Sequence, residues 1–164
     1  MSLAIYLGGK LFPHTLPFLR LLEQHHIEYS FVTNSSSVSG SDYQLKLSGL
    51  GIPVTSGQIV TSTHALIDFI REEYPEMRQL YFLGTPAFHN ELGLHGYRFS
   101  DYNPEAVAVG FDPAMNHQQL CRAAWWIARG KPFFATHPDR VCPTDGPTVL
   151  IDCGAVCSAL THAT

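Results

Sequence analysis

The sequence lacks a long apolar run, and it also lacks the basic start followed by an apolar centre that is typical of a secretory signal. We therefore expect a cytoplasmic protein that neither crosses nor contacts a membrane. Its 164 residues are 45% hydrophobic and 12% aromatic, which is sufficient for a substantial core. Disorder is excluded by the same composition.

Clusters of basic residues are missing as well. Ten Lys and Arg residues stand against fourteen Asp and Glu residues, which gives a net charge of −4 at pH 7. Binding a nucleic-acid backbone requires concentrated positive charge, and stacking bases requires aromatic side chains among the basic ones. Neither pattern occurs, so we expect no nucleic-acid partner.

Cysteine is scarce and is not arranged in close pairs. The four cysteines are Cys121, Cys142, Cys153 and Cys157, and without a secretory context we expect free thiols. A zinc site could be assembled from His137 and the last three, but none of these spacings is the short Cys-x-x-Cys of structural zinc sites. We expect no metal ligand in this chain, and the scattered histidines favour solvated surface positions.

What the sequence does contain is an alternation of helix and strand patterns. The periodicity predicts helices over 15–25 and 41–48, a helix carrying Leu66, Ile67 and Ile70, a short helix at Glu91 and Leu92, and a long helix capped by Asn116. It predicts strands over 28–33, 79–83, 106–110, 133–135 and 148–151. This order indicates an α/β fold with part of a doubly wound core. Trp125 and Trp126 are adjacent, so only one of them can face the core.

A hydroxyl-rich turn follows the first of these strands. The segment 29–37 reads YSFVTNSSS, which predicts a buried strand that ends in a turn just before a helix. Such a turn presents backbone N–H groups, a helix N-terminus and hydroxyl groups to an anion, and phosphate is the natural ligand. A simpler interpretation also stands, in which Thr33 only caps the helix that follows.

Other segments extend this pattern along the chain. They are YLGGKLFP at 6–13, LGIP at 50–53, IVTS at 59–62, YFLG at 81–84, VAVGFD at 107–112 and FFATHPD at 133–139. In this order, from about residue 5 to residue 164, they resemble the haloacid dehalogenase superfamily, in its p-nitrophenyl phosphatase and NagD-like branch with a type IIA cap. The resemblance implies a partial Rossmann-like core over 1–56, an α/β cap domain over 57–152, and a return towards the core over 153–164.

The catalytic motifs of that family are not matched. The resemblance implies an Asp-x-Asp-Gly motif just before the segment at 5–7, but residues 1–4 read MSLA and no Asp-x-Asp occurs in the sequence. The family's lysine and its magnesium-binding acidic pair would follow the helix that begins near Gly154. Lys131 imitates the lysine motif, but it follows a helix and leads into the cap-like segment 133–136. We therefore expect a fragment without the first, third and fourth motifs, with no catalytic residue of its own and inactive alone.

The resemblance also implies roles for individual residues. A complete enzyme would hydrolyse small phosphomonoesters through an aspartyl-phosphate with Mg²⁺, and we expect that ion to bind the complete enzyme and not this chain. Thr33 and Asn34 match the second motif, which holds phosphoryl oxygens. Thr136, His137 and Asp139 become candidates for substrate specificity in the cap, although His137 stands where the family usually has asparagine.

Two other functions stay open. The chain could be a stand-alone phosphate-binding module without catalysis, or a dimerisation module that uses the cap around Trp125 and Trp126. Unpaired strand edges favour self-association, so we expect a homodimer or oligomer, with the cap as one possible interface. The resemblance implies that the ligand is a small phosphorylated metabolite. The sequence does not identify which one.

Overall fold

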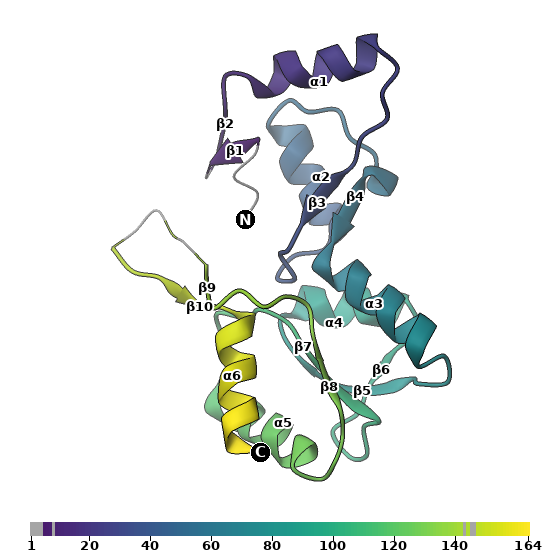
Figure 1. Ribbon diagram of the computed structural model, residues 1–164, viewed down its shortest axis with the longest axis vertical. Helices are drawn as coiled ribbons and strands as arrows, with labels where there is room; N and C mark the ends of the chain where they lie inside the picture. The colour runs from purple at the N-terminus through teal and green to yellow at the C-terminus, as the bar shows by residue number, and fades with distance from the viewer. Residues whose placement is uncertain (1–4, 8, 143, 145–146) are drawn as a thin grey trace.

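The computed structural model describes residues 5–7, 9–142, 144 and 147–164. Two parts follow one another along the chain (Figure 1), the first ending at β4 and the second beginning with α3. Each part has a hydrophobic core of its own. Among the described residues, no helix is long and apolar enough to cross a membrane.

The first part is a small α/β unit. Its elements are β1 (Tyr6–Leu7), β2 (Lys10–Leu11), α1 (Thr15–Gln24), β3 (Phe31–Thr33), α2 (Gly40–Gly49), a 3-10 turn (Ser56–Gln58) and β4 (Ile59–Thr61). β3 and β4 pair in parallel, with α2 as the crossover between them. The Ser39 side chain caps α2 and forms a capping box with Asp42. Tyr6, Leu19, Tyr43 and Leu47 are buried together in the core of this unit.

The expectation that β3 is a buried strand is wrong for one of its faces. Val32 is 70% exposed and its register partner Val60 is 38% exposed. Side chains alternate across a strand, so Phe31 and Thr33 face the core of the unit while Val32 points to the other side. Within the described chain, that side of the β3–β4 pair is open to solvent.

The second part is a sheet covered by helices on both faces. Its elements are α3 (Ser62–Glu73), β5 (Gln79–Leu83), α4 (Pro86–Leu94), β6 (Arg98–Phe99), β7 (Ala106–Val109), α5 (His117–Ile127), β8 (Phe133–Ala135), β9 (Val141–Cys142), β10 (Leu150–Ile151) and α6 (Cys153–Ala163). The sheet is parallel, in the order β6-β5-β7-β8. β9 and β10 form a separate antiparallel hairpin that projects from it (Figure 1).

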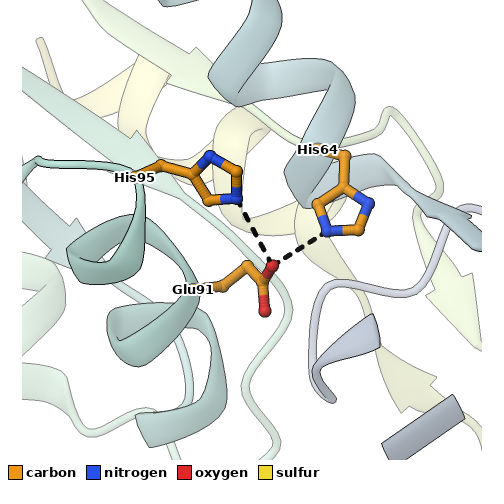
Figure 2. A group of neighbouring side chains, drawn as sticks. All are labelled: His64, Glu91 and His95. Atoms are coloured by element: carbon orange, nitrogen blue, oxygen red, sulfur yellow. Dashed lines mark hydrogen bonds and ion pairs between the residues drawn. The ribbon is translucent and has the colours of Figure 1, made fainter. Parts of the chain in front are cut away.

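Alternation along the central strands creates the two cores of this part. Leu80 and Phe82 face α3 and α4, where Leu66, Ile70 and Phe88 are buried. On the opposite face, Tyr81, Leu83, Val107 and Val109 pack against α5 and α6, including Trp126 and Leu160. α3 and α4 also meet through His64, Glu91 and His95 at their solvent edge (Figure 2). The result is a three-layer arrangement that confirms the α/β prediction.

Several finer predictions can be compared with these elements. Trp126 is buried at 5% exposure while Trp125 is 38% exposed, as expected for neighbours on a helix. Cys121, Cys153 and Cys157 are free thiols, as expected for them. The division at residues 56 and 152 stays a prediction, although α6 packs with α5 and β8 in the second part.

Candidate functional site

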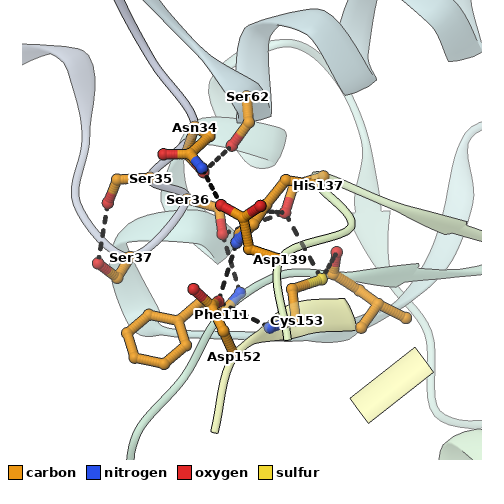
Figure 3. Close-up of polar contacts among 12 residues, drawn as sticks. Asn34, Ser35, Ser36, Ser37, Ser62, Phe111, His137, Asp139, Asp152 and Cys153 are labelled. Carbon is orange, nitrogen blue, oxygen red and sulfur yellow. Dashed lines mark hydrogen bonds and ion pairs between the residues drawn. The ribbon is translucent and has the colours of Figure 1, made fainter. Parts of the chain in front are cut away.

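The turn after β3 meets the loop after β8, although about a hundred residues separate them in the sequence (Figure 3). The Asn34 side-chain amide donates a short hydrogen bond to the Asp139 carboxylate. The Asn34 carbonyl accepts a hydrogen bond from Ser62 Oγ, at 2.8 Å, at the start of α3. The structure thus brings two predicted site residues, Asn34 and Asp139, into direct contact.

Ser36 joins the same two segments at a fully buried position. Its Oγ accepts the Phe111 backbone N–H at 2.8 Å and the Thr136 hydroxyl at 3.2 Å. Gly110 leaves room for this contact, since a Cβ there would lie 3.1 Å from Ser36 Oγ. Ser36 therefore fixes the turn after β3 against the ends of both β7 and β8.

His137 is buried and forms a dyad with Asp152 (Figure 3). Its Nε2 lies 2.9 Å from Asp152 Oδ1, and its Nδ1 lies 2.8 Å from Thr136 Oγ1. Asp152 also caps α6 by accepting the Cys153 backbone N–H at 2.7 Å. His137 is thereby held in place on both ring nitrogens, and it was the one histidine set apart from the solvated positions expected for most of the others.

The N-terminus of α6 packs against the loop at 136–139. Gly154 N–H donates to the Asp139 carbonyl at 2.7 Å, and a Cβ at Gly154 would lie 2.0 Å from the Pro138 carbonyl oxygen. The neighbouring Cys153 thiol has a pKa below its ordinary value, first because it is hydrogen-bonded to Cys157 and also because of Thr136 and His137. The same thiol pair raises the pKa of Cys157.

A cavity of about 260 Å³ opens beside these contacts. Its lining includes the side chains of Asn34, Ser35, Ser37, Lys46 and His137, and it is completed by Val38, Asp42, Tyr43, Phe111, Cys142 and Asp152. The Lys46 ammonium lies 4.5 Å from the centre of the Tyr6 ring and supplies positive charge to this wall. The cavity also carries the Asp42 and Asp152 carboxylates, but its hydroxyl, amide, imidazole and ammonium groups are donors of the kind that bind a compact anion.

Thr33, in contrast, is outside the lining of this cavity. Its Oγ1 donates to Tyr43 Oη at 3.1 Å and accepts the Ser35 N–H at 3.3 Å. Thr33 is 8% exposed, so in this conformation its hydroxyl shapes the turn. The alternative that Thr33 caps the following helix is wrong, because Ser39 is the N-cap of α2 and the Thr33 hydroxyl bonds to Tyr43 and Ser35.

Three residues of the site were not singled out from the sequence: Ser36, Ser62 and Asp152. A signal for Ser36 was present in the run of three serines, and Asp152 stands before a small, apolar helical segment as an N-cap residue does. Neither signal specifies a partner a hundred residues away. The long-range contacts themselves had no local signature.

The cluster of His137, Asp139 and Asp152 has donor atoms within 4.8 Å of one another. It does not fit magnesium, which prefers oxygen ligands in an octahedral arrangement. One donor is an imidazole nitrogen, and both carboxylates already accept N–H groups from Asn34 and Cys153. Among the residues that the structure describes, His137 groups with Asp139 and Asp152 and not with the cysteines of the zinc arrangement considered from the sequence.

Residues 4–98 match the family described as haloacid dehalogenase-like hydrolase. The chain is 30% identical over 148 residues to the ribonucleotide monophosphatase NagD of Escherichia coli, covering 90% of this chain and 57% of that protein. It is 27% identical to the 5′-nucleotidase YutF of Bacillus subtilis, covering 98% of this chain and 62% of that protein. The chain thus spans about three fifths of the length of these relatives.

Solved structures show the same similarity in three dimensions. A 4-nitrophenylphosphatase from Thermotoga maritima matches all of this chain with a TM-score of 0.94 and 30% identity, and 62% of that protein is covered. A glycerol phosphate phosphatase from Mycobacterium tuberculosis, solved in complex with magnesium, matches with a TM-score of 0.87 and 26% identity. This second match covers 98% of the chain and 48% of that protein.

Proposed function

Because the chain belongs to the haloacid dehalogenase-like hydrolases, in their NagD-like branch, we propose that it provides the phosphate-binding turn and the cap of a cytoplasmic phosphatase for small phosphomonoesters. The observation that carries the proposal is the meeting of the turn at 33–37 with the loop at 136–139 beside the 260 Å³ cavity. A phosphoryl group with a short leaving group matches a cavity of this size better than a large substrate does.

The side chains around the cavity suggest how a phosphate is held. Asn34, Ser35 and Ser37 offer amide and hydroxyl groups, and Lys46 offers a positive charge. Thr33 acts through Ser35, whose N–H it accepts, so we assign it a positioning role. Such groups stabilise phosphoryl charge but do not attack phosphorus.

The loop at 136–139 forms the specificity side of the proposed site. His137 faces the cavity, and the Thr136 and Asp152 contacts fix its ring. Asp139 orients Asn34 through their hydrogen bond. We propose that His137 contacts the leaving group, while Thr136 and Asp139 keep the loop against the turn and exclude water.

The chain alone is proposed to bind phosphate without hydrolysing its esters. Its sequence contains no Asp-x-Asp, and nucleophilic attack in this family requires a carboxylate that becomes phosphorylated. In a complete enzyme, a bound magnesium ion would supply positive charge to the phosphoryl group. The residues of this chain then supply the turn and the cap that surround the group.

The test measures binding and turnover on the same preparation. Titration with inorganic phosphate should show saturable binding that weakens about tenfold or more in Lys46→Met, because a charge-assisted contact is lost. Ser158→Ala, on the exposed face of α6, serves as the matched control and should bind normally. p-Nitrophenyl phosphate with Mg²⁺ should give no turnover above a Thr33→Ala control.

Two results would contradict the proposal. If phosphate does not bind, or binds equally well to Lys46→Met, the cavity is not a phosphate site. Magnesium-dependent turnover that Thr33→Ala abolishes means that the chain contains a nucleophile of its own. An intact-mass measurement accompanies the assay, so that a contaminating or longer enzyme is recognised.

A further inference from the structure

Three metal-binding side chains meet on a different surface, where α3 packs against α4 (Figure 2). Glu91 Oε1 lies 2.9 Å from His64 Nε2 and 3.7 Å from His95 Nε2. The three donor atoms all lie within 4.8 Å of one another. We propose that His64, Glu91 and His95 bind a first-row divalent cation, with zinc as the best match. The inference is independent of the proposed phosphatase function.

The separations are those of ligands around a small cation. With zinc bonds of about 2.0–2.2 Å, two ligand atoms of a tetrahedral site are roughly 3.4 Å apart. The observed 2.9 and 3.7 Å lie on either side of that value, and the two imidazole donor atoms lie within 4.8 Å of each other, so small shifts of these side chains would bring them to the separations of a zinc site. Two imidazoles and a carboxylate favour zinc over magnesium or calcium, which prefer oxygen ligands, and leave a fourth position for water.

The environment of Glu91 favours a cation. Its side chain is only 13% exposed, and among the described residues its ion-pair partners are His64 and His95. A carboxylate removed from water requires hydrogen bonds or a compensating charge. Imidazole provides that charge only when it is protonated, whereas a bound divalent cation provides it directly.

The backbone holds two of the ligands in position before any ion binds. Glu91 and His95 are four residues apart and lie on one face at the end of α4. Gly96 adopts a left-handed φ of 90°, and Tyr97 N–H closes the helix end on the Leu92 carbonyl at 3.1 Å. Leu92 is fully buried, so this helix end is anchored in the core.

The third ligand couples the proposed metal site to the start of α3. His64 Nδ1 accepts the Thr61 N–H at 3.3 Å in the capping box of that helix. A neutral ring in this arrangement carries its proton on Nε2 and donates it to Glu91. Metal binding at Nε2 would place the ring proton on Nδ1. A protonated Nδ1 can no longer accept the Thr61 N–H, so that hydrogen bond would be lost. Thr61 is followed by Ser62, whose hydroxyl donates a hydrogen bond to the Asn34 backbone carbonyl in the candidate phosphate site.

The experiment uses the metal-free full chain and titrates it with Zn²⁺ by calorimetry and with Co²⁺ by absorption. We expect one site with nitrogen and oxygen ligands and no thiolate charge-transfer band. Glu91→Gln keeps a hydrogen-bond acceptor for His64, yet it should weaken binding by at least about tenfold, as the loss of a ligand does. His117→Gln is the control, because His117 lies 3.3 Å from the Cys121 thiol and could form a competing site.

A second variant and a spectroscopic measurement separate loss of a metal ligand from loss of the fold. His95→Gln changes a partly exposed residue at the end of α4 and should weaken binding as much as Glu91→Gln, with an unchanged circular dichroism spectrum. Imidazole ¹⁵N shifts should show His64 changing its protonated nitrogen when zinc is added. The proposal is overturned if both variants bind normally, or if His117→Gln alone removes the site.

Discussion

Among single residues, Glu105 shows how one side chain can join two strands. Its carboxylate accepts the backbone N–H groups of Arg78 and Gln79, each at 2.7 Å, at the start of β5. These hydrogen bonds, first that of Arg78, hold the pKa of Glu105 below its ordinary value. A lowered pKa in the folded state means stabilisation that is complete above the unfolded value of 4.5 and is lost as the pH falls through the folded value.

Glu105→Gln should therefore lower the free energy of unfolding by about 1 kcal/mol at neutral pH, a modest value because the group is exposed. The difference from the wild type should shrink at acidic pH, as the pH falls below 4.5 and through the lowered pKa of the folded-state carboxylate. Urea unfolding at both pH values measures this. Glu72→Gln, on the exposed side of α3, should change little at either pH, and a pH-independent loss in Glu105→Gln would contradict the electrostatic explanation.

The same scale shows what the sequence can predict about the site. Thr33, Asn34, Thr136, His137 and Asp139 were all singled out. The structure pairs Asn34 with Asp139 and Thr136 with His137, and leaves Thr33 outside the cavity lining. Their assigned roles stay predictions. Ser36 and Asp152 were missed because their importance lies in partners distant in sequence, and a local pattern reports only neighbours along the chain.

At the scale of helices and strands, local sequence signals predicted where an element occurs better than they predicted how deeply it is buried. Asn116 was expected to cap a helix, and it does so through a capping box. β1, β2, β6 and β9 were missed because each has two residues, too few to display a period of two. The open face of β3 was also missed, since burial depends on what packs over the strand and not on the strand itself.

The contact between α6 and the loop before β9 gives a prediction at this scale. Gly154→Ala places a Cβ 2.0 Å from the Pro138 carbonyl oxygen, and displacing that backbone should cost about 1–3 kcal/mol of unfolding free energy. Gly93 is also helical, but a Cβ there meets nothing within 4 Å. Gly93→Ala should raise the unfolding free energy by about 0.5–1 kcal/mol.

Thermal and urea unfolding of the two alanine variants separate these effects. The comparison is matched, because both replace glycine by alanine within a helix. Equal changes of the same sign would show that the close approach at Gly154 does not limit the packing of α6.

For the whole molecule, the open β3–β4 face gives a prediction about self-association. Val32 and Val60 lie side by side in register and are both exposed. If two chains cover this face in a symmetric dimer, both copies of Val32 and of Val60 are buried. Val32→Thr should then weaken dimerisation by about tenfold or more, because apolar burial is lost while the strand shape is kept.

Sedimentation velocity over a range of concentrations measures this association. Val149→Thr, also exposed but distant in the fold near the β10 strand, should leave it unchanged. A wild-type chain that stays monomeric at every concentration would refute the prediction. Dimers that persist in Val32→Thr would direct attention to Trp125 and the cap.

The contacts around Ser36 also determine when the candidate site is assembled during folding. The bonds from Asn34 to Asp139 and from Thr136 to Ser36 close loops of 105 and 100 residues, and closing such loops is entropically costly and slow. The three hydrophobic clusters contain neither pair, so each can condense before the loops close. We expect the site to form last and to open first, while both parts of the chain keep their cores.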